Sequence, residues 1–392
     1  MKLLHFSDIH IGMENYAKLD PETGLSSRLL DFFNTFDFIV DLAIKENVDA
    51  VVFAGDAYKT RDPNPTQQRG FGERIKKLAK AGIPTILVVG NHDTPNAEGK
   101  ANTLDIYSAL EIDHVWVSRK PEYLKIPTKS GTLQVITLPW LHKNDYKTVG
   151  DKLKSLYDKI TSENSAIFLS HAEVEGSQYG SEKGMAIGTD VTIPLPLLQD
   201  KRLDYVALGH IHKHQVLSKP GDKPLVVYSG SPERIDFGEE KEEKGICLVE
   251  ITSNEKRETT FKFIPTSARI FRTIKVSLKP DDPDPTRTVI AEIEKHKVKD
   301  AIARIIVDIP ADLDKEIKMD LIKKALKEAN FIAGISRNVE RKERSASWRI
   351  DGQEEVERLT PIEALKKYFA AKKISLEKQK ELEKYAAQLL ES

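Results

Sequence analysis

Polar residues of the types that bind divalent metals recur in this sequence, each just after a short apolar run. The stretches that carry them are LLHFSDIH (Asp8 and His10), AVVFAGD (Asp56), TILVVGNHD (Asn91 and His92), AIFLSH (His171) and DYVALGHIH (His210 and His212). A single aspartate or histidine in such a place is usually a cap or a satisfied polar residue. Five such stretches in one chain instead indicate one shared metal site.

The residue types decide which metal chemistry is expected. The set offers carboxylate and amide oxygens and imidazole nitrogens but no thiolate. Such donors are typical of a site for manganese, iron or zinc, whereas a structural zinc site usually contains thiolates. All of these residues except His92 are predicted to be ligands, and they are too many for one tetrahedral ion. They fit two ions about 3.5 to 4 Å apart that share a bridging carboxylate and a bridging water. Such a pair hydrolyses phosphoesters, because it activates the water and stabilises the attacking and leaving oxygens.

The apolar runs are the elements that must position these residues. A run such as AVVFAG predicts a buried parallel strand, because strands covered on both faces are apolar without alternation. The polar residues then lie at the strand ends, and ligand sites of open α/β sheets form beyond the carboxyl ends of the strands.

The order of the motifs resembles that of the calcineurin-like metallophosphoesterases, and within them the SbcD family of double-strand-break nuclease subunits. FSDIHIG, FAGDAYK, VVGNHDTP, LSHAEVEG, LGHIHKHQ and YSGSPERIDFGE carry the resemblance, which is strong over residues 1 to 265 and weaker beyond. It implies two ligand groups that share Asp56 as the bridge. The first group is Asp8, His10, Asp56 and His212, and the second is Asp56, Asn91, His171 and His210.

His92 is the predicted catalytic residue. It directly follows a ligand in GNHD, so it can stabilise the transition state or protonate the leaving oxygen without binding metal. The sequence departs from the family at Lys59, where relatives place histidine or aspartate. A lysine is not expected to shuttle protons near neutral pH but can pair with a phosphate. His214 is a further substrate-binding candidate on the expected rim of the site, or else a solvated loop residue.

The amino-acid composition indicates the general class of protein. The chain has 392 residues, of which 31% are charged and 40% hydrophobic, as expected of a soluble globular protein. Its single Cys247 cannot form an internal disulfide, and the sequence shows neither a signal peptide nor a run long enough to span a membrane. We therefore expect a cytoplasmic, nucleoid-associated protein. The formal net charge of −1 neither supports nor excludes DNA binding.

The first 265 residues alternate strand and helix patterns. Helices are predicted at about 26 to 46, 66 to 81 and 102 to 109, the first from apolar residues at helical spacing. Further strands are predicted at VWV, LQVITLPW, AIFLSH, YVALGH, PLVVYSG, GICLVEI and TTFKFIP. The expected fold is therefore α/β (α+β), a two-layered β-sandwich flanked by helices.

A second module is predicted at residues 266 to 348, with a βαβαβ pattern and no metal or phosphate motif. The resemblance implies that it is a DNA-capping domain. Arg337 is the DNA-binding candidate taken from it, beside three neighbours, and each of the four is more often a plain solvated charge. These neighbours are Arg341, Lys342 and Arg344.

The last segment, 349 to 392, contains two amphipathic helical stretches that cannot bury their apolar stripe alone. The resemblance implies that this tail binds the coiled-coil base of an SbcC-type ABC ATPase, with Phe369, Tyr385 and Leu389 as anchors. It also implies a homodimer through the helices at 66 to 81 and 102 to 109, for which Leu104 and Tyr107 are candidate contacts unless they pack on their own sheet.

Two enzymatic hypotheses follow, and a binding-only scaffold is disfavoured because no ligand has been lost. The first is a manganese-dependent DNA nuclease subunit, a double-strand 3′–5′ exonuclease and single-strand or hairpin endonuclease that works in DNA repair with the ATPase. The second is a small-substrate metallophosphatase or a cyclic-nucleotide phosphodiesterase. GNHD, the GSPERIDFGE stretch, the second module and the helical tail favour the nuclease.

Overall fold

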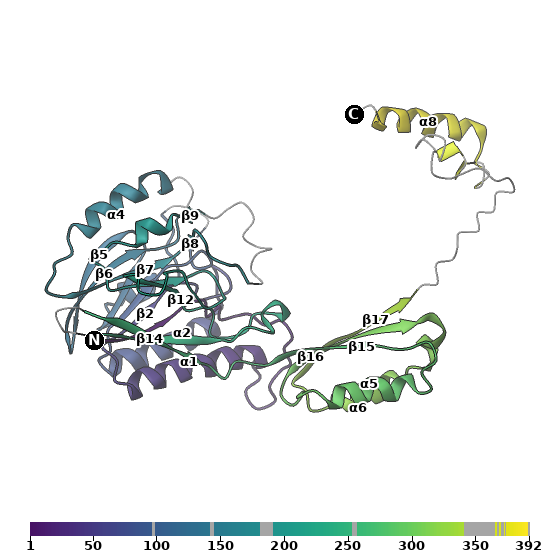
Figure 1. Ribbon diagram of the computed structural model, residues 1–392, viewed down its shortest axis with the longest axis horizontal. Helices are drawn as coiled ribbons and strands as arrows, with labels where there is room; N and C mark the ends of the chain where they lie inside the picture. The colour runs from purple at the N-terminus through teal and green to yellow at the C-terminus, as the bar shows by residue number, and fades with distance from the viewer. Residues whose placement is uncertain are drawn as a thin grey trace. The chain divides into compact units, whose positions relative to one another are not determined.

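Two six-stranded sheets carry the first 265 residues in the computed structural model (Figure 1). The structure describes residues 1–95, 99–141, 145–180, 191–252, 257–340, 365–366, 368–369, 372 and 374–390. The first sheet has the order β14 (Thr259–Pro265), β13 (Gly245–Ile251), β1 (Lys2–Phe6), β2 (Ala50–Phe53), β3 (Thr85–Val88), β4 (Val115–Ser118). The second has the order β11 (Gln215–Val216), β12 (Leu225–Tyr228), β10 (Tyr205–Gly209), β7 (Ser165–His171), β6 (Gly131–Leu138), β5 (Glu122–Thr128).

The strands that matter for the site run parallel. Strands β1, β2, β3 and β4 pair in parallel in the first sheet, and β6, β7, β10 and β12 do so in the second. Strand β13 joins the first sheet antiparallel to β1. The carboxyl ends of β1, β2 and β3 therefore meet at one edge, as do those of β7 and β10.

Each strand packs into two apolar layers, which explains why the runs show no alternation of polarity. Val52 and Ala54 belong to the core between the two sheets, whereas Val51 and Phe53 belong to the core under the helices. All four are fully buried. The expected two-layered sandwich with flanking helices is confirmed.

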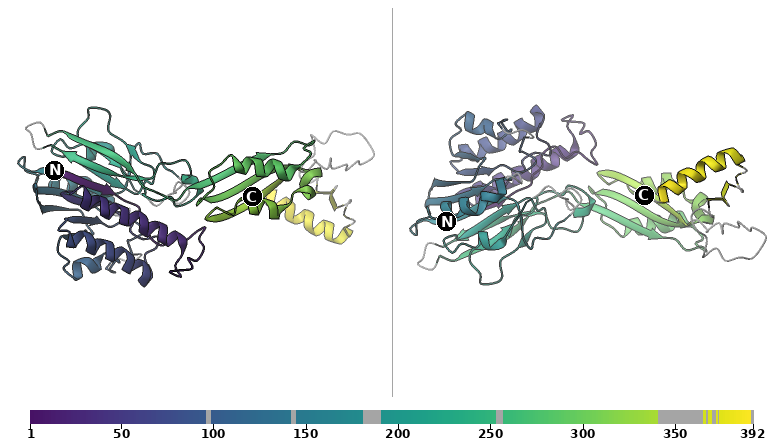
Figure 2. Two further views of the ribbon diagram at one scale, coloured as in Figure 1. Left: turned by 90° about the horizontal axis from the view of Figure 1, so that it is seen from below. Right: turned by 90° about the horizontal axis from the view of Figure 1, so that it is seen from above.

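Helices α1 (Ser27–Lys45), α2 (Pro65–Lys80) and α3 (Asp105–Ala109) cover the outer face of the first sheet, and Figure 2 shows α1 and α2 together on one side of the strands. Helix α1 begins after Ser26, whose side chain accepts a hydrogen bond from the backbone N–H of Leu29. Helix α2 begins with a capping box between Asn64 and Gln67. Helix α4 (Val149–Tyr157) packs on the outer face of the second sheet.

The structure differs from the sequence expectations in several places. Helix α3 is shorter than predicted, because the side chain of Asn102 accepts hydrogen bonds from the backbone N–H groups of Leu104 and Asp105 and so delays its start. Helix α4 and strand β5 were not predicted. Leu104 is fully buried and Tyr107 is 5% exposed, so both pack on their own sheet and are not available as dimer contacts.

The second module has the predicted order, β15 (Phe271–Ser277), α5 (Pro285–Glu294), β16 (Ile302–Pro310), α6 (Met319–Ala325), β17 (Phe331–Glu340). Its three strands form a separate sheet in which β15 and β16 run parallel. Both helices lie on one face of this sheet (Figure 1) and share with it an apolar core of their own.

The chain divides into two compact units, Met1–Val339 and Glu340–Ser392. The second unit contains α8 (Leu376–Leu390). The boundaries predicted at 265 and 348 remain predictions. Among the described residues, no helix is both long and apolar enough to cross a membrane.

Candidate metal centre

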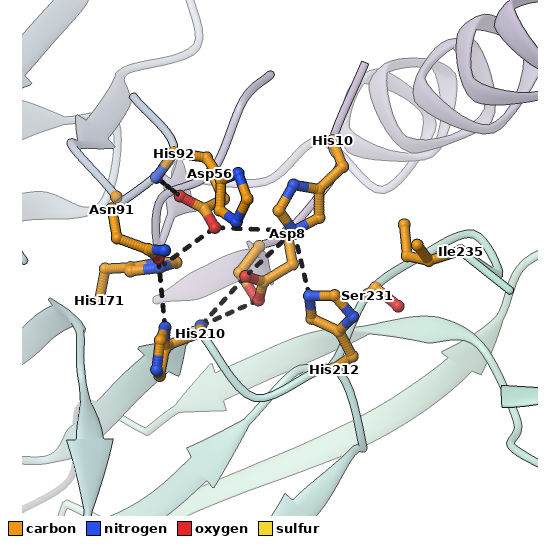
Figure 3. A network of polar contacts seen from close by, with 12 residues as sticks. Asp8, His10, Asp56, Asn91, His92, His171, His210, His212, Ser231 and Ile235 are labelled. Carbon is orange, nitrogen blue, oxygen red and sulfur yellow. Dashed lines mark hydrogen bonds and ion pairs between the residues drawn. The ribbon is translucent and has the colours of Figure 1, made fainter. Parts of the chain in front are cut away.

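The residues singled out in the sequence lie together beyond the carboxyl ends of the parallel strands of both sheets (Figure 3). Asp8 and His10 follow β1, Asp56 follows β2, and Asn91 and His92 follow β3. From the second sheet, His171 ends β7, and His210 and His212 follow β10. Six of these side chains are buried, whereas Asn91 and His92 are partly exposed. The topology thus brings all eight together.

Asp56 lies between the two halves of the set. Its Oδ2 is 3.6 Å from His10 Nε2 on one side and 3.4 Å from His171 Nε2 on the other. Asp8 is 4.0 Å from His10 Nε2 and accepts hydrogen bonds from the backbone N–H of His210 at 3.0 and 3.1 Å. The position of Asp56 is the one that a bridging carboxylate requires.

Pairs of neighbouring donor atoms have the separations expected of metal ligands. His10 Nε2 is 3.0 Å from His212 Nε2, and Asn91 Oδ1 is 2.9 Å from His171 Nε2 and 3.3 Å from His210 Nδ1. Ligands about 2.1 Å from an octahedral ion stand about 3.0 Å apart when they are adjacent. The donor set therefore fits divalent cations.

Three groups of Asp and His side chains could each hold an ion, since their ligand atoms lie within 4.8 Å of one another. These groups are Asp8, His10 and His212; Asp8, Asp56 and His171; and His10, Asp56 and His92. The first group lies within the first predicted ligand set, whereas the second combines Asp8 of that set with His171 of the other set and the shared Asp56. The third places His92 beside the centre, so its role as catalyst rather than ligand remains a prediction.

The electrostatics of the centre also favour a cation. Burial lowers the pKa of His10 well below its ordinary value, which keeps the imidazole neutral, as a ligand must be. Burial would raise the pKa of Asp56, but His171, His92 and His10 outweigh it and hold that pKa well below its usual range. Against the effect of burial, Asp56 and Asp8 raise the pKa of His171 to about 9. These buried carboxylates attract positive charge, which a bound divalent ion would supply.

The backbone around the centre is strained. Asp8, His10, Asp56 and His210 all have positive φ angles, of 54°, 45°, 60° and 97°. Such conformations are uncommon for residues other than glycine and cluster at functional sites. They turn each side chain toward the crevice directly after its strand.

Glycines in the motifs allow the strand ends to approach one another. A Cβ on Gly90 would stand 2.1 Å from Asp56 Oδ1, and one on Gly209 would stand 2.0 Å from the carbonyl oxygen of Ala54. No side chain fits at either position. The glycine before each ligand in GNHD and GHIH is therefore explained by close packing around the centre.

Two residues that sequence reasoning missed hold the predicted ligands in place. The carboxylate of Asp93 accepts hydrogen bonds from the backbone N–H groups of Asp56 (3.0 Å), Ala57 (3.0 Å) and Gly90 (3.1 Å), which ties the two loops together. Burial, with the nearby Asp56 charge, raises the pKa of Asp93 to about 7. The carboxylate of Glu239 accepts a hydrogen bond from His212 Nδ1 at 2.8 Å. Asp93 lies in the motif GNHD and Glu239 in GSPERIDFGE. Membership of these motifs was the one sequence feature that could have indicated their roles.

His92 is positioned by its backbone and by its ring. Its backbone N–H donates to Asp56 Oδ1 at 2.9 Å, and its Nδ1 donates to the carbonyl oxygen of Lys59 at 2.7 Å. Nε2 is therefore the ring atom that remains for substrate. Lys59 and His92 line a pocket of about 310 Å³ at the centre, together with Thr60, Arg61, Asp62 and Asn91.

The other candidates have different surroundings. The ring of His214 stacks on Phe263 at 4.2 Å, and its Nδ1 donates to the carbonyl oxygen of Tyr228 at 2.8 Å, which is a structural role. Arg337 is exposed and pairs with Asp314 at 3.0 Å. Phe369 is 2% exposed, whereas Tyr385 is 58% exposed. Residues 341 to 350 and the side chain of Leu389 lie outside the described residues.

Residues 1–214 match the family model of the calcineurin-like phosphoesterases. The chain belongs to this family. The match confirms the resemblance seen in the motifs, and the family uses divalent metal ions at a centre of this kind.

Curated relatives narrow the similarity further. The chain is 30% identical to the DNA double-strand break repair protein Mre11 of Sulfurisphaera tokodaii over 64% of this chain and 60% of that protein. It is 27% identical to the SbcD nuclease subunit of Bacillus subtilis over 65% of this chain and 68% of that protein. It is also 27% identical to the SbcD nuclease subunit of Escherichia coli K12, over 66% of this chain and 67% of that protein. The chain thus spans about 60% of the length of the first of these relatives.

Proposed function

We propose that this metallophosphoesterase is the nuclease subunit of an SbcCD-type DNA repair complex and that it hydrolyses DNA phosphodiesters at a manganese-loaded centre. The observation that carries the proposal is the complete ligand set around Asp56, in a chain whose curated relatives are named as DNA repair proteins and nuclease subunits. Exonuclease action on double-stranded ends and endonuclease action on hairpins are the activities we assign to it.

The roles of the residues follow from the geometry. Two divalent ions held by the seven ligands would supply Lewis-acid activation of water and neutralise charge on the phosphoryl oxygens. His92 Nε2 would donate a proton or hydrogen bond to the leaving oxygen, because Nδ1 is committed to the carbonyl oxygen of Lys59. Lys59 and Arg61, in the same pocket, offer positive charge to the phosphates on either side of the cleaved bond.

A basic groove on the other side of the loop at 91 to 95 supports a nucleic-acid substrate. Its volume is about 290 Å³, and among the residues that the structure describes its lining has four cationic side chains and no acidic one. The lining consists of Val89, Thr94, Pro95, Gly99, Lys100, Asn102, Arg119, Lys120, Pro121, Pro139, Trp140, Leu141 and Lys152. Thr94 connects it to the metal centre, since its carbonyl oxygen accepts a hydrogen bond from Arg61 Nε.

The charges of this groove are available to a ligand. Arg119 pairs with Asp105, but Lys100, Lys120 and Lys152 form no ion pair with any residue that the structure describes. Trp140 adds a half-buried aromatic ring to the same lining. A positive groove with an aromatic platform is the general design of single-strand binding sites. A small-molecule phosphatase has no use for such a surface.

A nuclease assay tests the proposed function. The purified chain is incubated with end-labelled duplex DNA and hairpin DNA in the presence of Mn²⁺, with and without ATP and an SbcC-type ATPase. We expect Mn²⁺-dependent cleavage of both substrates. Hydrolysis of p-nitrophenyl phosphate or a cyclic nucleotide without any cleavage of DNA would instead assign the centre to a small substrate.

The groove gives a prediction of its own. The variant Lys100→Glu/Lys120→Glu should bind a single-stranded oligonucleotide at least tenfold more weakly at low salt, because phosphate contacts supply most of the affinity. Fluorescence anisotropy measures this. The matched control is Lys45→Glu/Lys80→Glu, which makes the same charge change at the last residues of α1 and α2. Equal loss in both variants would mean that net charge, not the groove, binds the strand.

The tail is the proposed contact with the ATPase. Tyr385 and Leu382 are exposed on α8, by 58% and 36%, and so replace the buried Phe369 as the anchors we would test. The homodimer is likewise proposed, and the exposed apolar residues of its predicted helical surface are Ile106 and Leu110 rather than Leu104 and Tyr107.

Deleting residues 353 to 392 should leave Mn²⁺-dependent cleavage of simple substrates largely intact, because every predicted ligand precedes residue 213. It should abolish co-purification with the SbcC-type ATPase, since docking of a helix depends on a few large apolar anchors. Tyr385→Asp in the full chain should weaken the same interaction, and Lys384→Glu beside it serves as control. A truncated chain that still retains the ATPase would place the contact elsewhere.

A further inference from the structure

Behind the predicted metal ligand His212 lies the buried carboxylate of Glu239. Glu239 Oε1 accepts a hydrogen bond from His212 Nδ1 at 2.8 Å, and Glu239 Oε2 accepts one from the backbone N–H of Ile235 at 2.9 Å. The side chain of Glu239 is fully buried. Both carboxylate oxygens are therefore fixed, one by the loop and one by the imidazole.

A buried ammonium group completes the arrangement. Lys244 Nζ lies 2.9 Å from Glu239 Oε2, and the two side chains are fully shielded from solvent. The same Nζ donates hydrogen bonds to the carbonyl oxygen of His212 (3.2 Å), to Ser231 Oγ (2.9 Å) and to Glu242 Oε2 (2.8 Å). Lys244 therefore contacts both the partner of the imidazole and the backbone of the same histidine.

This arrangement continues into the segment that leads to the second module. Arg234 Nε donates to the carbonyl oxygen of Glu239 at 3.3 Å, and its Nη1 donates to that of Arg269 at 3.2 Å. Arg269 in turn forms an ion pair with Asp31 on α1. The loop that carries Glu239 is thus held on the side away from the metal centre as well.

We propose that Glu239, held by Lys244, is the positioning residue that fixes the orientation and tautomer of His212 and thereby sets the affinity of the ion that His212 binds. The inference rests on the proposed metal centre and extends it to two residues that touch neither metal nor substrate. Glu239 ends the GSPERIDFGE stretch, and neither residue is among the predicted ligands.

The geometry gives the physical reason. A carboxylate at Nδ1 keeps the proton on that nitrogen, so the lone pair lies on Nε2, the atom that faces His10 Nε2 at 3.0 Å. A carboxylate behind a metal-bound histidine also makes the imidazole a stronger donor, and its loss typically costs 10- to 100-fold in metal affinity. Lys244 makes it possible to keep that charge in a buried position.

The test must separate this role from simple stability. Glu239→Ala removes the fully buried carboxylate beside the Lys244 ammonium, leaves Glu242 as its remaining carboxylate partner, and is expected to destabilise the fold. The informative variant is Glu239→Leu/Lys244→Met, in which an apolar pair replaces the buried ion pair. Its thermal midpoint in EDTA should stay near that of the wild type. Titration calorimetry should show one of the two Mn²⁺ sites weakened about 10- to 100-fold and the other little changed.

A spectroscopic readout and two further variants complete the experiment. Electron paramagnetic resonance at two equivalents of Mn²⁺ should show the coupled pair in the wild type and mainly single ions in the double variant. Glu239→Gln, which keeps an oxygen acceptor, should recover part of the affinity if the double variant does not fold. Glu242→Gln, which removes a different partner of Lys244, should bind Mn²⁺ as the wild type does.

Two outcomes overturn the inference, and they are distinguishable. If Glu239→Leu/Lys244→Met binds two Mn²⁺ ions with wild-type affinity, or if Glu239→Gln does so when the double variant does not fold, Glu239 serves only as the counter-charge of Lys244. If the wild-type chain itself binds no Mn²⁺, the metal centre and this inference both fail.

Discussion

Asp56→Ala is expected to bind neither Mn²⁺ ion tightly and to lose all phosphodiesterase activity. The reason is the position of its carboxylate, within 3.6 Å of an imidazole nitrogen in each half of the ligand set. Without it, two dications would face each other across the gap with no negative charge between them, a strongly repulsive arrangement in a buried site. Titration calorimetry with Mn²⁺ and a duplex-cleavage assay measure the two effects.

The choice of substitution matters because Asp56 has a φ of 60°. Alanine in this left-handed conformation adds about 1–2 kcal/mol of strain, whereas asparagine tolerates it. Asp56→Asn therefore removes the charge with little backbone cost and should lose metal as Asp56→Ala does. Asp113→Asn, at an exposed aspartate outside the pocket lining, is the control and should bind Mn²⁺ normally. Two ions bound to Asp56→Asn with near wild-type affinity would contradict the bridging assignment.

The sequence was sufficient to predict the strands that carry the candidate site and the gathering of the predicted ligands, for a physical reason. Continuous apolar runs such as AVVF are typical of strands buried on both faces, and parallel strands end together. Asp56 after β2 and Asn91 after β3 had to meet once those strands were neighbours. The sequence pattern did not predict how the second sheet packs against the first. His171, which lies on the second sheet, was therefore assigned to the metal site from its motif and not from the topology.

What could not be predicted depends on contacts between distant segments. The roles of Glu239 and Lys244 arise because both side chains lie behind His212, which is 27 residues before Glu239 in the chain. The burial of Leu104 is likewise a tertiary effect, because a leucine at a helix start has no pattern that tells core from interface. Helix α4 was missed since its surroundings include many charged residues and no strong stop signal.

His92→Ser is expected to keep both metal ions and to cleave DNA on the order of a hundredfold more slowly. A positioned proton donor or oxyanion stabiliser contributes about that much. The hydrogen bond from residue 92 to Asp56 Oδ1 comes from the backbone N–H, so removal of the imidazole leaves this link to the bridging carboxylate in place. Metal binding should therefore survive while the step that needs the Nε2 atom is lost.

The experiment compares single-turnover cleavage of an end-labelled duplex with Mn²⁺ titrations of the same variants. His92→Gln, which keeps an amide donor toward the carbonyl oxygen of Lys59, tests whether slower cleavage comes from the missing imidazole or from a loosened loop. It should be as slow as His92→Ser. His296→Ser, in the second module just beyond the C-cap of α5, should cleave like the wild type. Loss of one Mn²⁺ ion from His92→Ser would instead make His92 a ligand, as its place beside His10 and Asp56 also permits.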